Sequence, residues 1–375
     1  MQTYLSTTFS GNRIDKNFSI PYNSNMSVYG KKQIDIREDN KSAVIDILLK
    51  GEATMLEMSE RLKLSHTALA KVIKELTLKN IVQPTEVRGA NTGRPPKVYG
   101  INGDCAIACA VVISPEKIYV YYLDMRGFQI NETSCDNLFA DFSSLMNYVT
   151  GQVEFLKSHP RLNDKILKCI YIGVPAAGLF GMSYPDTERE VLAACAARFS
   201  LQEIVVRRNI DYEMVAETKY GLLKGGDQNA VLVNLDRRLC ASFLFNGNLF
   251  CGDRQKQGLG SAEEFGGVYA LFPHSFESAA AQYRAGEESA RETLERALRE
   301  PLTGLGKLLA FLDVGEVVFS GGVKALGDPF LRFAGTLLGE NCSVRYSALG
   351  KEVPAALSGA VWLSTYSTLQ KVMAR

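Results

Sequence analysis

Apolar residues after position 40 recur at the spacing of three short amphipathic helices. Residues 41–50 place their apolar side chains on one helical face, and residues 53–62 repeat the pattern. Ser65 precedes a third such stretch, 67–79, and a serine at this position suits the N-terminal cap of a helix. The spacing therefore predicts three consecutive helices joined by short turns.

Two alternating stretches, 81–83 and 97–99, follow these helices and predict the strands of a hairpin. The segment between them is polar, too long for a tight turn, and contains Gly93-Arg94-Pro95-Pro96. Three helices followed by a basic hairpin are the parts of a winged helix-turn-helix, which places its third helix in the DNA major groove. We therefore predict a DNA-binding domain at residues 41–102.

The third helix and the hairpin arm carry short polar and cationic side chains that can reach bases and phosphates. An arginine in the arm would suit a narrow minor groove, where the potential is most negative. The alternatives are an ordinary solvated helix face and an exposed loop. The predicted DNA-binding residues are Ser65, His66, Thr67, Ala68, Lys71, Lys74, Arg88, Arg94 and Lys97.

The pattern changes after Asp104 to strand pairs followed by helices, and this order occurs twice. Such a repeat predicts a duplicated α/β body with a cleft between its halves. The predicted strand pairs are 106–113 with 118–123 and 231–235 with 242–245, the second closed by Asn246-Gly247; further strands are 166–174, 204–207 and 315–323, and helices are 139–157, 211–223 and 275–312.

The composition is that of an ordinary soluble protein, with 46% hydrophobic and 22% charged residues and a net charge of +1. Overall charge thus gives no support for nucleic-acid binding, which must rest on local clustering. The eight cysteines form no CxxC pair, so we expect no zinc site and no disulfides. No apolar run reaches a membrane span, and residues 1–40 lack a secretory signal. We expect a cytoplasmic protein without membrane contact.

Several motifs in this order resemble the ROK family, named for repressors, open reading frames and kinases. The motifs are the winged helix ending in Gly93-Arg94-Pro95, the strand into Val174-Pro175, the Asn before the helix that ends Glu217-x-x-x-Gly221, and the late Ser320-Gly321-Gly322-Val323. The resemblance implies a two-lobed actin/hexokinase-like (ribonuclease H-like) body with a sugar site between the lobes. It also implies repressors that release DNA when a sugar or sugar phosphate binds.

The resulting division has four parts. Residues 1–40 form a mobile or loosely packed extension, and residues 41–102 form the winged helix-turn-helix domain. Residues 103–220 form the first α/β lobe and residues 221–375 the second.

The phosphate-binding motifs of the family kinases are degenerate in this chain. The first phosphate loop falls on 112–116, where the expected Asp is missing and Pro115 lacks an N–H donor. The glycine-rich second loop is replaced by residues 236–240, whose side chains would obstruct close backbone approach to a phosphate. We therefore expect no catalysis, no cofactor and no metal.

Three residues remain candidates for binding a ligand. Asn209 can donate to and accept from sugar hydroxyls, and Glu264 lies where the family has a carboxylate. Asp211 lies one position C-terminal to the place where the family has its catalytic base. Its simpler interpretation is the N-cap of the next helix. The alternative for Glu264 is a solvated acidic residue beside Glu263. Because Gly267 replaces the family's histidine, the alternatives for the site are a ligand other than the family's usual aldohexoses and no ligand at all.

The sequence favours a transcriptional repressor of carbohydrate metabolism. Its partners would be a double-stranded DNA operator, a sugar or sugar-phosphate effector, and a second copy, as a homodimer or homotetramer. The alternatives are an ATP-dependent sugar kinase that carries a DNA-binding domain, and a constitutive DNA-binding or scaffold protein.

Overall fold

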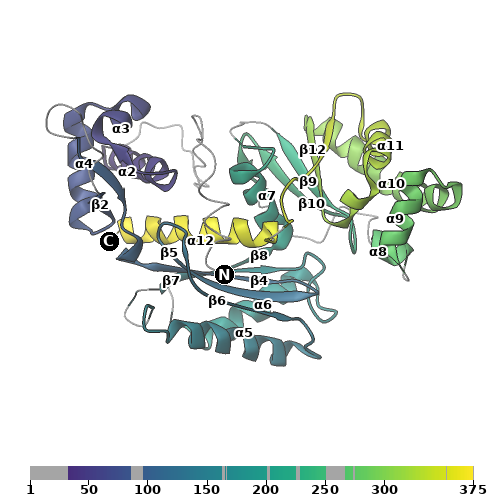
Figure 1. The fold of residues 1–375 in the computed structure, drawn as a ribbon, viewed down its shortest axis with the longest axis horizontal. Coiled ribbons are helices and arrows are strands. Elements are labelled where there is room, and N and C mark those ends of the chain that lie inside the picture. The colour runs from purple at the N-terminus through teal and green to yellow at the C-terminus, as the bar shows by residue number, and fades with distance from the viewer. Residues whose placement is uncertain are drawn as a thin grey trace.

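The computed structural model has three parts, an N-terminal domain and two α/β lobes, joined by one long C-terminal helix (Figure 1). It describes residues 33–85, 96–162, 165, 167–200, 203–224, 229–250, 267–272, 275–351 and 353–374.

The N-terminal domain is a winged helix-turn-helix. Its elements are α2 (Gln33–Leu49), β1 (Ala53–Thr54), α3 (Met55–Leu62), α4 (His66–Leu78), β2 (Val82–Thr85) and β3 (Val98–Ile101). The three strands form one antiparallel sheet in the order β1-β3-β2. The predicted helices and hairpin are present, with two differences. Helix α2 starts within residues 1–40, which were predicted to form an extension, and β1 takes the place of the first two residues of the second predicted helix. The first two turns of α2 are polar, so periodicity alone does not reveal them.

Local capping fixes the helix-turn-helix. The Ser65 hydroxyl accepts from the Ala68 N–H at 3.2 Å, as the sequence predicts. Thr54 and Glu57 form a capping box at the start of α3. Lys63 adopts a left-handed conformation, with φ of 53°, and ends α3 two residues before the cap of α4. These contacts set the angle at which α4 leaves the domain.

Two five-stranded sheets with the same topology form the lobes, in the orders β6-β5-β4-β7-β8 and β11-β10-β9-β12-β13. In each sheet the first three strands of the lobe form an antiparallel meander, and two parallel strands follow beside the first of them. The predicted duplication is therefore confirmed. The first-lobe elements are β4 (Ile107–Ile113), β5 (Lys117–Asp124), β6 (Gln129–Asp136), α5 (Phe142–Lys157), β7 (Leu167–Val174), α6 (Tyr184–Ala196) and β8 (Glu203–Arg208).

The second lobe follows the same plan with a larger helical layer. Its elements are β9 (Ala230–Asn234), β10 (Cys240–Phe245), β11 (Asn248–Leu249), α8 (Val268–Leu271), α9 (Phe276–Ala285), α10 (Glu288–Phe311), β12 (Glu316–Ser320), the 3-10 turn Gly322–Leu326, α11 (Asp328–Leu338) and β13 (Ser343–Tyr346). One turn was assigned wrongly, because Asn246 and Gly247 connect β10 to β11 and do not close the β9–β10 pair. The short β11 carries too little pattern to be seen in the sequence.

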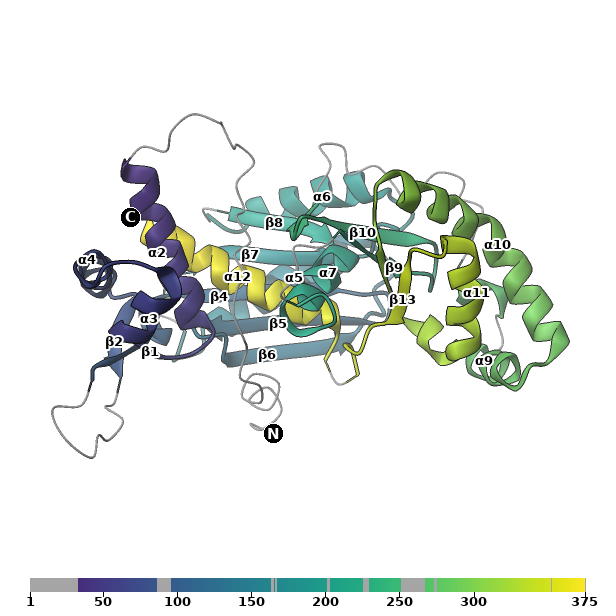
Figure 2. The same cartoon turned by 90° about the horizontal axis from the view of Figure 1, so that it is seen from above.

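Two helices cross between the lobes, α7 (Asn209–Tyr220) and α12 (Ala355–Met373), and they pack against each other. Seen from above, α12 runs over β4 and β7 toward the N-terminal domain (Figure 2). Its close crossing with α7 requires Gly359, where an added Cβ would lie 1.9 Å from the Tyr212 carbonyl oxygen. The segment 221–375 thus ends in a helix that packs on the first lobe.

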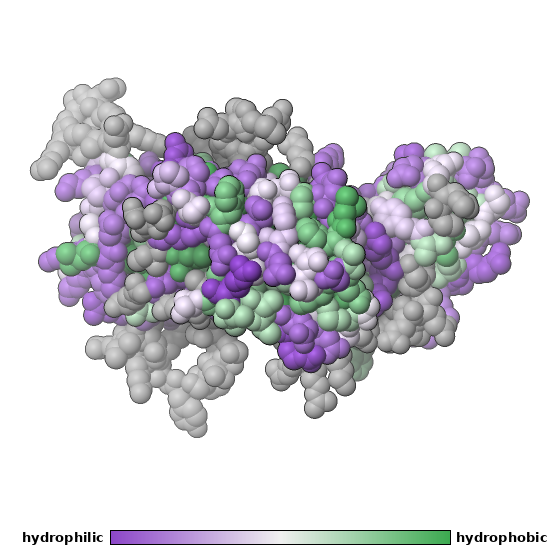
Figure 3. All heavy atoms as spheres, turned by 90° about the horizontal axis from the view of Figure 1, so that it is seen from below, coloured by the Kyte–Doolittle hydropathy of each residue, from purple (hydrophilic) through white to green (hydrophobic). Residues whose placement is uncertain are grey.

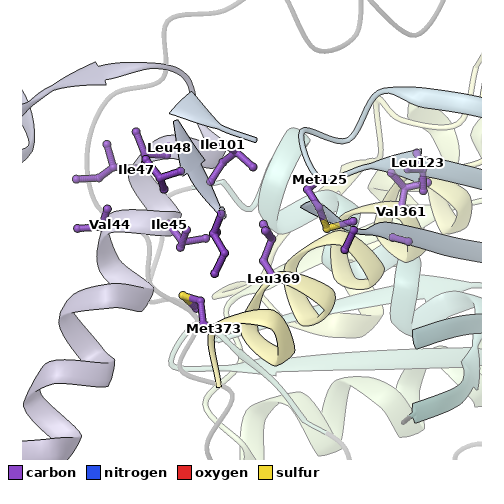
Figure 4. Packing of buried hydrophobic residues seen from close by; sticks show 14 of the residues in the cluster. Val44, Ile45, Ile47, Leu48, Ile101, Leu123, Met125, Val361, Leu369 and Met373 are labelled. Carbon is purple, nitrogen blue, oxygen red and sulfur yellow. The ribbon is translucent and has the colours of Figure 1, made fainter. Parts of the chain in front are cut away.

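The core of the N-terminal domain is continuous with the core of the body. Val44, Ile45 and Leu48 of α2 belong to the same buried cluster as Leu369 and Met373 of α12 (Figure 4). A shared core of this kind removes apolar surface of both the domain and the body from water. Each Å2 of apolar surface buried in this way stabilises the fold by about 25 cal/mol. The N-terminal domain is therefore docked on the body, and not merely tethered to it.

The outer face of the first lobe mixes hydrophilic and hydrophobic side chains, and hydrophobic atoms gather toward its middle (Figure 3). The large exposed apolar side chains among the described residues of this lobe are Phe128, Leu138, Phe155 and Phe180. None of the helices within the described ranges is long and apolar enough to cross a membrane.

Candidate nucleic-acid interface and interlobe sites

Helix α4 lies at the edge of the molecule (Figure 1). The side chains of its polar face are exposed. Leu69, Val72, Ile73 and Leu76 are buried, which leaves the predicted DNA-binding side chains on the other face. His66, Thr67, Lys71 and Lys74 are exposed, and Ala68 is half-buried. Ser65 is exposed as well, although its hydroxyl already serves the helix cap.

The same face borders a groove of about 530 Å3 that the sequence did not reveal. Ala68, Lys71 and Lys74 line it from α4, and Arg37 and Asn40 line it from α2. Because α2 begins earlier than its apolar pattern, no sequence signal placed Arg37 beside the third helix. The groove adds a further cation to the predicted interface.

Glu75 of α4 fixes this extra cation. Arg37 donates to its carboxylate at 2.6 and 3.0 Å, and the buried Lys41 lies 2.5 Å from the other carboxylate oxygen. The hydrogen bond from Lys41, followed by that from Arg37, holds the pKa of Glu75 below its usual range. The guanidinium, whose side chain is 64% exposed, is thereby held at the rim of the groove.

Two of the predicted arm residues, Arg88 and Arg94, and the ligand candidate Glu264 lie outside the described residues. Lys97 is described and exposed, directly before β3. It lies at the foot of the hairpin, on the same domain as α4.

Asp211 is held by a bidentate ion pair between the lobes. Arg208 donates to its two carboxylate oxygens at 3.0 and 2.7 Å, and the Ser242 hydroxyl donates at 2.8 Å. The N-cap interpretation of Asp211 is wrong: the cap is Arg208, without a side-chain hydrogen bond, and Asp211 is the third residue of α7. A buried carboxylate needs charged and hydroxyl partners of this kind, and here they come from both lobes.

Asn209 begins α7 and ties it to the first lobe. Its Nδ2 donates to the Ile113 carbonyl at 2.8 Å, and its Oδ1 lies against Gly173, where an added Cβ would be 2.3 Å away. That Oδ1 is buried and has no hydrogen-bond partner within the described part of the chain. The amide thus keeps one acceptor for a further donor.

The two turns that stand in place of the phosphate loops face each other. Arg237 of the β9–β10 turn pairs with Glu116 of the β4–β5 turn at 2.9 Å, and both side chains are more than half exposed. The β4–β5 turn is closed by Ser114 and Lys117, whose backbone N–H groups both hydrogen-bond within the turn. With Pro115 between them, this turn offers few free donors to an anion.

Two acidic side chains, Asp236 and Glu213, lie near the ends of β9 and β12. Asp236 accepts from the Gly322 N–H at 2.7 Å, and the Ser320 hydroxyl donates to Glu213 of α7 at 2.7 Å. Burial, together with the nearby Asp236, raises the pKa of Glu213 to about 7, and burial also raises that of Asp236. The Gly322 N–H is therefore already bonded to the Asp236 carboxylate, so this glycine turn does not offer that donor to an anion.

Gly267 packs against the β9–β10 turn. It has φ of 86°, and an added Cβ would lie 2.3 Å from the Asp236 carbonyl oxygen and from the Arg237 carbonyl carbon. Neither a histidine nor any other side chain fits at this position without moving backbone. No cluster of histidine, cysteine and acidic residues suited to a metal occurs among the described residues.

Comparison with known proteins gives matches at the level of structure. No family model matches the chain, and no curated protein matches its sequence. The structure of a ROK family transcriptional regulator, a homologue of the E. coli MLC protein, superposes with a TM-score of 0.67 at 14% identity, covering 91% of this chain and all of that one. A Listeria monocytogenes protein assigned as an N-acetylmannosamine kinase superposes with a TM-score of 0.52 at 14% identity, covering 69% of this chain and 98% of its own.

The kinase match leaves about a third of this chain uncovered, whereas the regulator match leaves less than a tenth. Identities this low report on the fold, which agrees with the winged domain and the duplicated α/β body described above. The chain has the fold of a ROK family transcriptional regulator.

Proposed function

We propose that this protein is a ROK family transcriptional regulator that binds operator DNA through α4 and the hairpin arm. The observation that carries the proposal is the exposed, cationic face of α4, with Lys71, Lys74 and Arg37 around one groove. Cations on a protruding helix neutralise phosphates and position the helix in the major groove. Its expected role is repression of carbohydrate genes.

Lys97, Arg88 and Arg94 complete the proposed interface as the hairpin arm. Lys97 is exposed at the foot of the hairpin, which is where an arm beside the recognition helix starts. Winged domains bind as pairs on palindromic sites, so we infer a homodimer or homotetramer in the cytoplasm.

We further propose that the body senses an effector without phosphorylating it. Asp236 already accepts from Gly322, the N–H groups of Ser114 and Lys117 are bonded within the β4–β5 turn, and Asp211 is paired with Arg208. Phosphoryl transfer depends on donors and a base that are free to act on phosphate and hydroxyl, and these groups are engaged within the chain. The unpaired Oδ1 of Asn209 supports a hydroxyl-bearing effector such as a sugar, with Asp211 and Glu264 as further candidates.

A sugar kinase is the second candidate, favoured by the likeness of the body to an assigned sugar kinase. The two functions make opposite predictions for one pair of assays. The regulator enriches specific duplexes from a random DNA pool and transfers no phosphate from ATP to hexoses in the presence of magnesium. Phosphorylation of a hexose without duplex enrichment would replace the proposal with the kinase.

A further inference from the structure

Helix α7 contacts the second lobe near one end and α12 near the other. Near its N-terminus, Asp211 accepts from Ser242 of β10 and Glu213 accepts from Ser320 of β12, both in the second lobe. Near its C-terminus, Lys219 lies over the Trp362 ring of α12, with Nζ 3.7 Å from the ring centroid. Twelve helical residues span about 18 Å, so one rigid element joins these contacts.

The packing around α7 leaves little room for it to bend. On one side, Ile210 and Met214 are buried against Leu232 and Val318 of the second-lobe sheet. On the other side, Tyr212 meets α12 at Gly359. A close-packed helix shifts as a unit and not residue by residue. A displacement of the second-lobe sheet is thus expected at the C-terminal end of α7 as well.

That end contacts α12, and α12 shares a buried core with α2 of the N-terminal domain, where Ser42 also donates to Gln370 at 3.3 Å. Burial lowers the pKa of Lys219 to about 8 and raises that of Asp46, on α2, to about 6, and the charge of each residue opposes the effect of burial on the other. Lys50 of α2 contributes to the same electrostatic group. Separating two desolvated opposite charges is costly, because each loses its compensation without regaining water. The position of Lys219 on α12 therefore biases the position of α2, through the shared core as well as through these charges.

Helix α2 in turn holds the DNA-contacting face. Its Arg37 and Lys41 pair with Glu75 of α4, so a shift of α2 reaches the recognition helix through ion pairs. We propose that α7 is a strut that couples the arrangement of the two lobes to the DNA-binding domain through α12, with Lys219 over the Trp362 ring as its contact point. The inference rests on the proposed function and adds the route by which the body controls DNA binding.

The chain carries its own reporter at this contact, because Trp362 is its only tryptophan. The ring stacks on Tyr366 at 5.0 Å and lies under the Lys219 ammonium, so its emission reports movement of that group. The lobe arrangement can be changed from outside through the exposed Glu116–Arg237 pair. Glu116→Arg replaces attraction between the two turns with repulsion, and Glu116→Arg with Arg237→Glu restores the attraction.

The test measures operator affinity and Trp362 emission of the full chain on DNA selected with the wild-type protein. We expect Glu116→Arg to change the operator Kd at least threefold and to shift the emission, and the double reversal to restore both. In a Lys219→Met background, Glu116→Arg should leave Kd unchanged. Lys219→Arg, which keeps the cation, and Lys224→Met, which removes an exposed lysine beyond α7, should both retain the response.

An equal change of Kd in the wild-type and Lys219→Met backgrounds would overturn the strut, and so would a Kd that does not respond to Glu116→Arg. Both results presuppose that the wild-type chain binds DNA. Failure of the wild-type protein to select any duplex contradicts the proposed function instead, so the two failures are distinct.

Discussion

Lys79 donates a hydrogen bond of 2.5 Å from its Nζ to the carbonyl oxygen of Met373. Lys79 is the C-terminal cap of α4, and Met373 is the last residue of α12, so α4 and the C-terminal helix meet at their ends. Ser42 of α2 adds a hydrogen bond of 3.3 Å to Gln370. The N-terminal domain and the body are therefore held together as one unit on this side of the molecule.

Met373→Ala tests whether this junction stabilises both partners. The side chain is buried in the shared core, and its truncation leaves a cavity between α2 and α12. We expect a loss of about 2–4 kcal/mol in unfolding free energy. In hydrogen exchange, the amides of α4 and α12 should lose protection together. Met373→Leu, which conserves volume, should cost less than about 1.5 kcal/mol. Unchanged protection in α4 would argue that the domain is stable on its own.

Glu213→Gln tests the buried acidic cluster through pH. Because burial raises the folded-state pKa of Glu213 from 4.5 to about 7, its contribution to stability is present below pH 4.5 and is lost as the pH rises through 7. Relative to wild type, the glutamine variant should therefore gain up to about 3 kcal/mol between pH 4.5 and pH 8. Urea unfolding at several pH values measures this difference. If the unfolding free energies of the two proteins changed in parallel with pH, the pKa of Glu213 would not be raised in the folded state.

Gly267→Ala tests the close packing that excludes a side chain from the β9–β10 turn. The variant adds the cost of a positive φ, about 1–2 kcal/mol, to a backbone clash at 2.3 Å. Gly286→Ala is the matched control, with φ of 84° and open space around the added Cβ. We expect the first variant to lose at least about 2 kcal/mol more than the second in thermal or urea unfolding. Equal losses would mean that the turn yields and that residue 267 can accept a side chain.

Much of this fold follows from periodicity in the sequence. The stripe of Leu69, Val72, Ile73 and Leu76 gave α4 to within one residue, and the cap at Ser65 gave its start. The repeated strand-pair pattern gave the duplication of the body. By contrast, α12 was not predicted, because it is apolar on most of its surface and has little amphipathic pattern.

The sites were less accessible from sequence, since they depend on contacts between distant residues. Lys71 and Lys74 could be named from their positions on a predicted helix, whereas Arg37 joins them only through Glu75. Asp211 was misread as a cap because α7 begins two residues earlier than its pattern suggests, and because Ser242, which donates to Asp211, comes from the other lobe. Pairing across the fold of this kind leaves no local spacing to read.

The central claim is that α4 reads DNA, and its most direct test is operator affinity as a function of salt for Lys71→Ala and Lys74→Ala. Each variant should weaken binding about three- to tenfold near 0.15 M salt and should lower the slope of log Kd against log salt by about 1. Lys224→Ala, an exposed lysine of the body, should leave affinity and slope unchanged. If Lys71→Ala and Lys74→Ala bind the selected operator with the wild-type affinity and slope, α4 is not the DNA-binding helix.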